Sequence, residues 1–463
     1  MKKINELIDT NYDLDIFGIT DDSRDVKEGF IFVATKGYNV DHFDYIDSAI
    51  KNGCCFLVVD RKIEIDFPHI IVDNIFSFYI ELCKKFYDVD LDDFNFIGIT
   101  GTDGKTTTTT IIQRLIDDCA YIGTNGIVVK DKLLATSNTT PCISELYRDL
   151  SIIKSNNIKN VVMEVSSEAL LHDRLNGFKF DIIGFTNITG DHLNVHKTFK
   201  NYFDCKLKLL TLLKDDGYVF VNGDDLHLQS IKHKNMSSFG FNDNNDYKII
   251  SVNKKSNYVD INLSCKDENI ILHSPLFGKY NVYNVVMAFI VCLQFGVNKD
   301  ILMKKIKKLK PISGRCEFLN FGNDFDIVLD YAHTINGIDN ILDAFNNGRY
   351  NRIITVSGAA GGREHEKRNV IGNILIDKSD IAVFTIDDPR YEKVDDIIDE
   401  MVGERKDYIR IVDREEAIKY ALDIASRGDV VLILGKGRDN YMAIEDKKVP
   451  YNDYDVIKKY FSK

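Results

Sequence analysis

The chain has 463 residues, a length that exceeds one hydrophobic core and predicts about three domains. Its hydrophobic content of 44% and charged content of 28% are ordinary for a soluble globular protein. The formal net charge of −12 argues against a general nucleic-acid or membrane-surface role, so any anionic ligand must be held by a local concentration of arginines and lysines.

The nine cysteines are scattered without a Cys-x-x-Cys pair, and most lie in apolar runs. This pattern favours small buried side chains in a reducing compartment over disulfides. No apolar signal region follows Met1, and no apolar run approaches the length of a membrane span. We therefore expect a cytoplasmic protein without nucleic-acid binding or membrane insertion. As a separate prediction, we expect it to be a monomer.

Residues 1–91 are predicted to form a small N-terminal α/β domain. Its short apolar runs alternate with helical patterns and predict strands at 31–34, 56–59 and 70–72. A helix is predicted near 74–86. The segment 88–93 is mostly aspartate, too short and too acidic for a core element, and is predicted to be a linker.

Residues 92–312 are predicted to form the central domain. Its apolar runs are longer and are separated by helical stretches, which is typical of a parallel sheet covered on both faces. These runs predict strands at 94–99, 160–165, 182–186 and 217–222. The segment 238–274 alternates more and predicts an antiparallel addition, whereas 281–295 predicts a long helix.

Residues 313–463 are predicted to form a Rossmann-like C-terminal domain after a break at 311–315, PISGR, which we interpret as a hinge. Helices separate the predicted strands, which lie at 326–329, 352–356, 381–384 and 430–434. The expected fold is therefore α/β, with three domains and a central phosphate-loop domain flanked by the other two. The loops of the two larger domains are expected to face a cleft.

A glycine turn in the segment 101–107, GTDGKTT, follows the apolar strand at 94–99 and precedes a helical pattern at 107–116. In such a turn the backbone N–H groups curl around an anion, and Lys105 would neutralise phosphates. The hydroxyl of Thr106 or Thr107 would bind Mg²⁺. The spacing departs from the standard G-x-x-x-x-G-K-[ST], because residue 99 is Ile, and a short match of this kind also occurs in structural turns. The strand before it and the helix after it favour phosphate binding.

Two further predicted strands end in polar residues. Glu164 lies at the end of the strand predicted at 160–165, where ligands of parallel sheets bind, and would suit Mg²⁺. The alternative is a solvated glutamate beside a serine that caps the next helix. His192 follows the next strand and could be a metal ligand or a capping residue. Lys206, taken alone, has the pattern of a surface lysine.

Taken together, these segments resemble the Mur ligases, the ATP-dependent amide ligases of peptidoglycan precursor synthesis. The resemblance begins with the segments 100–107 (TGTDGKTT), 164–167 (EVSS), 186–193 (TNITGDHL) and 202–206 (Y-x-x-x-K). The opening at 22–37 resembles the uridine-nucleotide-binding segment of the third and fourth ligases. Resemblance to the third, MurE-type ligases lies at 138–141 (NTTP), 281–284, 314–317 (GR-x-E), 330–334 (DYAHT), 388–390 (DPR) and 435–437 (GKG). The matches run from about residue 22 to about residue 439.

The resemblance implies an enzyme that adds the third amino acid, meso-diaminopimelate or L-lysine, to UDP-MurNAc-L-Ala-D-Glu through an acyl phosphate. The implied cofactors are ATP, Mg²⁺ and a carbamylated Lys206. The pathway serves cell-wall biogenesis, and through it cell shape and division. No protein nucleophile is required.

The resemblance also implies the site residues, grouped by what they would bind. Catalysis would depend on Lys105, Glu164, His192 and Lys206. The metal ligands would be Thr106, Glu164, His192 and the carbamylated Lys206. ATP would be bound by Gly101, Thr102, Asp103, Gly104, Lys105, Thr106, Thr107, Asn284, Arg315, Asp330 and His333. UDP-MurNAc-dipeptide would be bound by Ser23, Thr139, Thr140, Ser166 and Arg174. The incoming amino acid would be bound by Arg363, Asp388, Arg390, Gly435 and Asp439.

Several positions depart from the family pattern. Asp103 replaces the usual Asn and should weaken ATP binding unless Mg²⁺ or Lys105 compensates, and Glu168 replaces the usual His. In the amino-acid pocket the usual D-N-P-R becomes DDPR at 387–390, and G-K-G-H-E becomes GKGRD at 435–439. Arg390 argues for a distal carboxylate on the substrate, and Asp388 argues for a distal ammonium. Diaminopimelate carries both, so we favour it, with a paralogue acting on another amino acid as the alternative.

Two other hypotheses remain open from the sequence. A folylpolyglutamate synthetase shares the superfamily, but the Asp22–Arg24 opening and the whole domain before the phosphate loop count against it. A non-catalytic nucleotide-binding protein or NTPase switch would lose the metal and carbamate positions, yet Glu164, His192 and Lys206 are all present.

Overall fold

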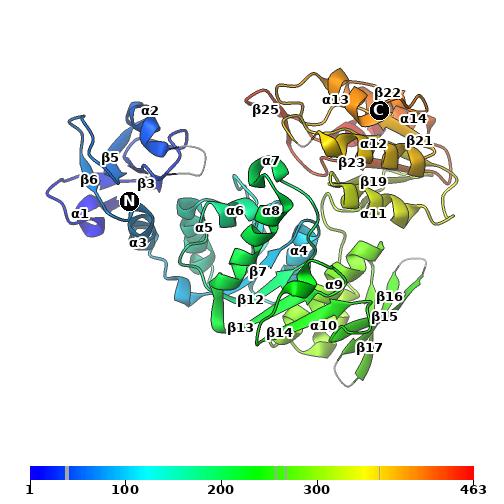
Figure 1. Cartoon of the computed structure of the whole chain (residues 1–463), viewed down its shortest axis with the longest axis horizontal. Coiled ribbons are helices and arrows are strands. Elements are labelled where there is room, and N and C mark those ends of the chain that lie inside the picture. The colour runs from blue at the N-terminus through cyan, green and yellow to red at the C-terminus, as the bar shows by residue number, and fades with distance from the viewer. Residues whose placement is uncertain (37–40, 256–257, 266–267, 364, 463) are drawn as a thin grey trace.

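The computed structural model describes residues 1–36, 41–255, 258–265, 268–363 and 365–462, and Figure 1 shows them as three lobes in chain order. Each lobe is built on its own large sheet, with four, eleven and six strands respectively. The expected α/β class with three sheet domains is therefore confirmed. The domain limits at 91/92 and 312/313 stay predictions.

The N-terminal lobe is a parallel four-stranded sheet in the order β3-β4-β5-β6. Its strands are β3 (Gly18–Thr20), β4 (Phe30–Val33), β5 (Cys54–Val59) and β6 (His69–Ile71). Its helices are α1 (Ile4–Leu7), α2 (Ile46–Lys51) and α3 (Ile75–Tyr87). The side chain of Asn74 caps α3 by accepting from the Ser77 N–H. A short antiparallel pair, β1 (Lys2–Lys3) with β2 (Asp15–Ile16), was not predicted from the sequence.

The acidic segment 88–93 is not only a linker. Leu91–Asp93 form a 3-10 helix, η2, and the Asp90 carboxylate caps it by accepting from the Asp92 N–H. Val89 and Leu91 are buried in the same core as α3. The prediction that this segment contributes nothing to the core was wrong, because its two apolar residues sit between aspartates that point to solvent.

The central sheet has the order β10-β9-β8-β11-β7-β12-β13-β14-β15-β16-β17. The run from β8 to β15 is parallel, and the strands outside it add antiparallel pairs at both edges. The strands on one side are β7 (Asn95–Thr100), β8 (Cys119–Gly123), β9 (Gly126–Val129), β10 (Lys132–Leu134) and β11 (Asn160–Glu164). The remaining strands are β12 (Phe180–Phe185), β13 (Leu213–Asn222), β14 (Met236–Gly240), β15 (Tyr247–Lys254), β16 (Val259–Cys265) and β17 (Glu268–Ser274).

Both faces of this sheet are covered, as the apolar runs predicted. Val161 of β11 belongs to the core that contains Leu146 of α5, whereas its neighbour Val162 belongs to the core that contains Ile111 of α4. The helices are α4 (Lys105–Leu115), α5 (Ile143–Ser155), α6 (Ser167–Leu171), α7 (Leu193–His196), α8 (Phe199–Leu207), α9 (Lys279–Gln294) and α10 (Lys299–Ile306). The predicted antiparallel addition is confirmed for β15 to β17.

The C-terminal lobe is a six-stranded sheet in the order β18-β19-β23-β20-β21-β22, parallel except for β18. Its strands are β18 (Glu317–Leu319), β19 (Asp326–Asp330), β20 (Ile353–Ser357), β21 (Ile381–Phe384), β22 (Ile409–Arg410) and β23 (Val430–Leu434). Its helices are α11 (Ile335–Phe345), α12 (Glu366–Lys378), α13 (Val394–Val402), α14 (Arg414–Ile424) and α15 (Asp453–Phe461). A hairpin of β24 (Tyr441–Ile444) and β25 (Lys447–Pro450) follows β23.

Among the helices of the described ranges, none is long and apolar enough to cross a lipid bilayer.

Candidate active site

The loop at 101–104 joins β7 to the N-terminus of α4 and requires glycine at both ends. Gly101 and Gly104 have φ angles of 149° and 84°. A Cβ at Gly101 would lie 1.8 Å from the Thr186 hydroxyl oxygen, and one at Gly104 would lie 2.5 Å from Asn284 Oδ1. The chain therefore passes so close to its neighbours that only glycine fits, and the free N–H groups of α4 open onto this loop.

Two lysine ammonium groups meet at the carbonyl of Gly101. Lys105 Nζ lies 2.9 Å from that oxygen and 2.8 Å from the carbonyl oxygen of Thr102. Lys206 Nζ, on α8, lies 2.8 Å from the same Gly101 oxygen. Burial lowers the pKa of Lys105, and burial together with the charge of Lys105 lowers the pKa of Lys206 well below its ordinary value. Lys206 is buried, so the prediction of a surface lysine from its pattern alone was wrong.

Glu164 ends β11 with its carboxylate fully buried. It accepts hydrogen bonds from the Tyr121 hydroxyl at 2.6 Å, the Thr124 N–H at 2.9 Å and the Thr106 hydroxyl at 2.9 Å. Ser166 does cap α6, by accepting from the Ala169 N–H. Glu164 is nevertheless not solvated, so the alternative of a solvated glutamate beside the cap was wrong.

His192 lies at the N-terminus of α7 in a left-handed conformation, with φ 55°. Its ring nitrogens lie 3.4 Å from a Glu168 oxygen and 3.5 Å from an Asp191 oxygen. The interaction with His192 lowers the pKa of Glu168 to about 2. Tyr202 connects this group to the loop, because its ring stacks on His192 and its hydroxyl lies 3.0 Å from the Thr102 hydroxyl. The Lys206 ammonium lies 4.8 Å from the centre of the same ring.

Four of the residues predicted to bind the UDP-MurNAc-dipeptide surround Glu164. The Thr140 hydroxyl donates to the Glu164 carbonyl at 2.8 Å and accepts from the Ser166 N–H at 3.0 Å. Arg174 donates to the Thr140 carbonyl at 3.1 Å, and the Thr139 hydroxyl lies 3.1 Å from that of Thr124.

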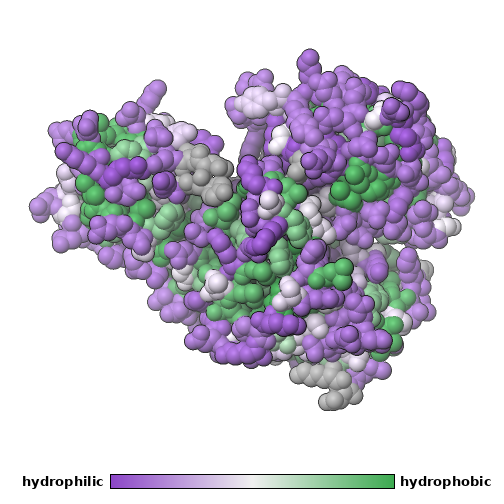
Figure 2. Space-filling view, viewed as in Figure 1, coloured by the Kyte–Doolittle hydropathy of each residue, from purple (hydrophilic) through white to green (hydrophobic). Residues whose placement is uncertain are grey.

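The fifth of these residues, Ser23, lies after β3 in the N-terminal lobe, where its carbonyl accepts from Asn52. No described hydrogen bond joins Ser23 to the other four. On the face drawn in Figure 2 the surface is hollowed between the N-terminal and C-terminal lobes. A ligand that contacts both groups of residues would have to span this hollow.

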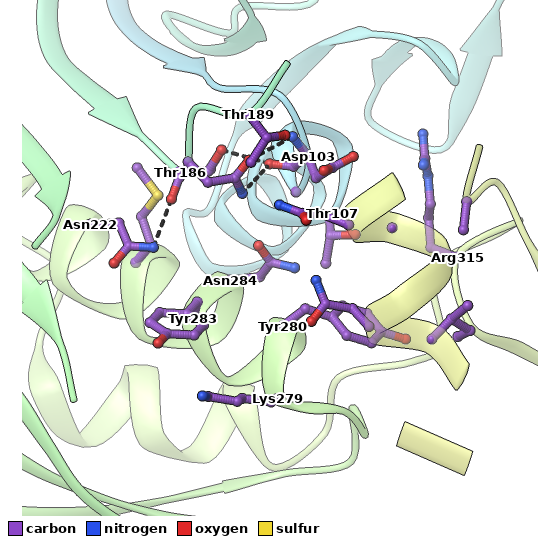
Figure 3. Close-up of a pocket in the computed structure, with 18 of the residues that line it drawn as sticks. Asp103, Thr107, Thr186, Thr189, Asn222, Lys279, Tyr280, Tyr283, Asn284 and Arg315 are labelled. Atoms are coloured by element: carbon purple, nitrogen blue, oxygen red, sulfur yellow. Dashed lines mark hydrogen bonds between the residues drawn. The ribbon is translucent and has the colours of Figure 1, made fainter. Parts of the chain in front are cut away.

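A cavity of about 310 Å³ lies between the central and C-terminal lobes. Figure 3 shows Asn284 directed from α9 towards the phosphate loop, with Tyr280 and Tyr283 beside it. The Tyr283 hydroxyl donates to Asp224 at 2.7 Å. The predicted ATP residues that line this cavity are Asp103, Gly104, Thr107, Asn284, Arg315, Asp330 and His333. Apolar, aromatic and polar walls of this kind suit a nucleoside next to a phosphate loop.

The C-terminal lobe contacts the phosphate loop directly. Arg315 donates to the Thr106 hydroxyl at 3.1 Å, and its guanidinium lies 4.4 Å from the centre of the Tyr331 ring. Lys367, on α12, lies 2.9 Å from the carboxylate of Asp191, next to His192. The Asp330 carboxylate accepts from the N–H groups of Cys316 and Ala332 and so fixes the chain just after Arg315.

The residues predicted to bind the amino acid lie in three loops at the carboxyl ends of β20, β21 and β23, where ligands bind in parallel sheets. Asp388 follows β21, but its carboxylate is already paired with Lys436, at 2.8 Å. Asp439 lies 3.8 Å from the same ammonium group. A Cβ at Gly435 would lie 2.5 Å from Asp387, so glycine is required there.

The side chain of Arg390 lies beside the loop that carries Arg363, the other arginine of this pocket. A Cβ built on Gly362, next to Arg363, would lie 3.6 Å from the side chain of Arg390. Arg390 has φ 51°, a strained value for arginine. Within the described residues, neither guanidinium has a hydrogen bond or ion pair. Both are therefore available to an anionic ligand.

The phosphate loop offers oxygen ligands of the kind that Mg²⁺ takes. Among the described residues, no group of three or more His, Cys, Asp or Glu side chains is placed to hold a metal ion. The hydroxyl of Thr106 and the carboxylate of Glu164 lie 2.9 Å apart at the phosphate loop. Two hard oxygens of this kind fit Mg²⁺, which binds phosphate oxygens and keeps several waters.

Sequence reasoning missed several residues that complete this site. Tyr280 and Tyr283 each directly precede an asparagine of the 281–284 segment on one helix, so their spacing was a usable signal. Tyr121, Lys367 and Lys436 carried no such signal, because each meets its partner across a long sequence separation.

Family comparisons agree with this arrangement. Residues 15–85 match the Mur ligase family catalytic domain, residues 99–292 the Mur ligase middle domain, and residues 314–437 the Mur ligase glutamate ligase domain. A UDP-N-acetylmuramoyl-L-alanyl-D-glutamate--2,6-diaminopimelate ligase of Fusobacterium nucleatum is 34% identical, over 98% of this chain and 95% of the relative. The enzyme of the same name from Aquifex aeolicus is 33% identical, over 95% of this chain and 92% of the relative.

Solved structures share the fold. A structure of a UDP-N-acetylmuramoyl-L-alanyl-D-glutamate--2,6-diaminopimelate ligase aligns with a TM-score of 0.65 at 25% identity, covering 100% of this chain and 99% of the other. MurF ligase from Thermotoga maritima in complex with ADP aligns with a TM-score of 0.66 at 19% identity, covering 90% of this chain and 93% of the other. Folylpolyglutamate synthase of Mycobacterium tuberculosis covers only 77% of this chain. The full-length relatives and the three matched domains show that the chain belongs to the Mur ligase family of ATP-dependent ligases.

Proposed function

We propose that this chain joins meso-diaminopimelate to UDP-MurNAc-L-Ala-D-Glu with ATP, as the names of its full-length relatives state for those proteins. One observation carries the proposal: Lys105, Lys206 and the Thr106–Glu164 pair converge at one glycine loop beside a nucleoside-sized cavity. The alternative amino acid is L-lysine. The domain limits proposed are 1–91 for the uridine nucleotide, 92–312 for ATP and 313–463 for the amino acid.

The reaction follows from how the residues are placed. A carboxylate is a poor electrophile, so its oxygen attacks the γ-phosphorus of ATP and forms an acyl phosphate, releasing ADP. The amine of the incoming amino acid then attacks the acyl carbon, and phosphate leaves. Lys105 and the N-terminus of α4 would stabilise the negative charge on the transferred phosphoryl group, with Arg315 close by.

We assign the ATP site to the loop residues Gly101, Thr102, Asp103, Gly104, Lys105, Thr106 and Thr107, and to Asn284, Arg315, Asp330 and His333 around the cavity. The lobe that carries Arg315 also brings Thr334 and Lys367 against the central lobe. Closure of this kind excludes water from an acyl phosphate, which would otherwise hydrolyse.

Thr106, Glu164 and His192 are the residues that would hold Mg²⁺, together with Lys206 in carbamylated form. When bound, Mg²⁺ neutralises charge on the phosphoryl oxygens. The lowered pKa of Lys206 supports the carbamate, because the neutral amine is the form that attacks CO₂. The new N–C bond forms as the amine loses a proton, and the neutral side chain thereby gains an anionic oxygen that would bind the metal.

The remaining assignments concern the other two substrates. Ser23, Thr139, Thr140, Ser166 and Arg174 would bind the UDP-MurNAc-dipeptide across the hollow of Figure 2. Arg363, Asp388, Arg390, Gly435 and Asp439 would form the amino-acid pocket, in which the two unpaired guanidiniums favour a substrate with a distal carboxylate. We further propose that the enzyme acts as a monomer in the cytoplasm, where ATP and its uridine nucleotide substrate are found.

The deciding experiment measures phosphate release from ATP with UDP-MurNAc-L-Ala-D-Glu, offering meso-diaminopimelate and L-lysine separately. Turnover with diaminopimelate and little with lysine is the expected result. Turnover with lysine alone would retain the ligase and change its amino acid. Turnover with neither would contradict the proposed substrates and point to a paralogue with a different acceptor.

A further inference from the structure

Lys436 is a buried cation at the centre of the proposed amino-acid pocket. Its side chain is 1% exposed, and its ammonium lies 2.8 Å from Asp388 Oδ1. The carboxylates of Asp387 and Asp439 lie 3.8 Å from the same ammonium. One lysine therefore faces three acidic side chains from two loops, and the shortest contact is to Asp388.

Asp388 is held on a second side as well. The same Oδ1 atom accepts a hydrogen bond from the Ala443 N–H of β24, at 2.9 Å. Its carboxylate is fixed in position, and its charge is balanced by a cation of the protein itself. An ammonium group of a ligand placed against Asp388 would also lie near the ammonium of Lys436, which repels it.

On the other side of the pocket, Arg390 is positioned by its main chain, whereas its charge and that of Arg363 are not balanced by any described residue. The main chain of Arg390 is fixed by β24 and the turn after it, because its N–H donates to the Ala443 carbonyl at 3.0 Å and its carbonyl accepts from the Glu445 N–H at 2.8 Å. These bonds hold Arg390 in its left-handed conformation. As noted above, neither its guanidinium nor that of Arg363 has a partner among the described residues. The pocket thus offers unsatisfied positive charge and a satisfied negative charge.

Resting on the function proposed above, we propose that Lys436 is a specificity-determining residue that neutralises Asp388, so that the pocket selects the distal carboxylate of the amino acid and not its distal ammonium. The substrate class that follows is an α-amino acid whose side chain ends in a carboxylate. The distal amino group of diaminopimelate is then tolerated and contributes little to recognition.

Three amino acids of similar length distinguish recognition of the distal carboxylate from recognition of the distal ammonium. Meso-diaminopimelate carries both, L-2-aminopimelate carries only the carboxylate, and L-lysine carries only the ammonium. Phosphate release with UDP-MurNAc-L-Ala-D-Glu gives kcat/KM for each. In the unaltered enzyme, loss of the ammonium should cost less than about tenfold, and loss of the carboxylate at least about 100-fold, since the arginines are then left unpaired.

Variants test the part played by Lys436 through the ratio of kcat/KM for L-2-aminopimelate to that for L-lysine, which partial unfolding does not change. Lys436→Met should lower this ratio at least about tenfold, because the charge of Asp388 becomes available to lysine. The double variant Lys436→Met with Asp388→Asn should restore the ratio. Lys448→Met, in the exposed hairpin nearby, is the matched control and should leave it unchanged.

The double variant keeps the test decisive if Lys436→Met does not fold, because it removes both members of the buried pair and leaves neither charge unpaired. Its ratio should stay within about threefold of the unaltered enzyme. A change of tenfold or more in the ratio for this variant would overturn this inference and leave the proposed function standing. A preference of the unaltered enzyme for L-lysine over L-2-aminopimelate would do the same. Absence of phosphate release with all three amino acids would overturn the proposed function and this inference with it.

Discussion

The hydroxyl of Thr334 lies 3.0 Å from Oδ1 of Asp103 and joins the C-terminal lobe to the phosphate loop. The same hydroxyl accepts from the Gly337 N–H and so caps α11, which directs its single proton to the carboxylate. The main-chain N–H of Asp103 donates to the Asn187 side chain at 3.0 Å, which fixes the main chain that carries the carboxylate. The acid that replaces the family's usual Asn therefore has a donor from the neighbouring lobe.

Thr334→Val should raise KM for ATP, because it removes the hydrogen bond that holds the C-terminal lobe against the phosphate loop. A net hydrogen-bond contribution of about 0.5–1.5 kcal/mol corresponds to an increase of about two- to tenfold. The same change removes a helix cap and should lower stability by about 1 kcal/mol. Steady-state phosphate release against ATP concentration measures the first effect, and thermal unfolding the second.

Thr334→Ser is the matched control for this change, because it keeps the hydroxyl and the cap. Its KM for ATP should match that of the unaltered enzyme. Equal KM values for the Val and Ser variants would show that the bond to Asp103 does not contribute to nucleotide binding.

Much of the proposed phosphate and metal site could be predicted, because adjacent parallel strands end at the same edge of a sheet. Residues that follow β7, β11 and β12 must meet at one edge of the sheet, since the three strands are adjacent and parallel. Glu164 is the last residue of β11, and Lys105 and His192 lie in the segments that follow β7 and β12, so their sequence positions carried the information. Lys206 lies on a helix, and only the family resemblance distinguished it from a surface lysine.

The amino-acid pocket was harder to predict because its key contact is not local. Asp388 and Lys436 are 48 residues apart and follow β21 and β23, which have β20 between them. From the sequence, Asp388 was interpreted as a free partner for a substrate ammonium, because nothing in its own segment shows the lysine that pairs with it. The short strands β24 and β25 were missed for a related reason: their residues are mostly exposed and carry no apolar alternation.

Asp453→Ala should destabilise the C-terminal lobe strongly. Arg414 and Asp453 form a doubly hydrogen-bonded ion pair, with both contacts at 2.8 Å and side chains that are 1% and 0% exposed. Removal of one partner leaves a buried charge unpaired, which costs about 3–5 kcal/mol. Because Arg414 also donates to the Leu434 carbonyl, just before Gly435, KM for the amino acid should rise as well.

The exposed pair Lys200–Asp204 provides the comparison, with side chains 82% and 49% exposed. Asp204→Ala should change stability by less than about 1 kcal/mol. Thermal unfolding of the two variants checks the contrast. Similar losses in both would contradict the assignment of a stabilising role to the buried pair.

Stability should fall as pH rises because of Asp149. Burial raises the pKa of this carboxyl to about 7, although Arg148 hydrogen-bonds one of its oxygens; the other oxygen has no hydrogen-bond partner among the residues that the structure describes. Between the ordinary pKa of 3.8 and about 7, the folded chain binds a proton that the unfolded chain releases. The slope of unfolding free energy against pH is therefore negative in this window. Asp149→Asn removes the titrating carboxyl and should therefore remove its contribution to this slope.

Melting temperatures at pH 5 and pH 8 measure this effect. The unaltered protein should lose a few degrees more than Asp149→Asn over this range, with Asp204→Asn behaving like the unaltered protein. An Asn variant with the same pH dependence as the unaltered protein would exclude Asp149 as the responsible group.

Lys206→Ala should abolish ligation and leave ATP binding nearly intact, if Lys206 supplies the proposed carbamate. The side chain lies behind the phosphate loop, bonded to the Gly101 carbonyl, and not in the cavity assigned to the nucleoside. Loss of an anionic metal ligand at the reacting phosphate should lower kcat by at least about 100-fold. Phosphate release measures kcat, and calorimetric titration with ADP measures nucleotide binding.

Lys200→Ala, which changes an exposed lysine on the same helix, is the control and should retain full activity. Depletion of CO₂ should slow the unaltered enzyme and not affect the residual rate of Lys206→Ala. Full activity of Lys206→Ala would remove this lysine from the metal site.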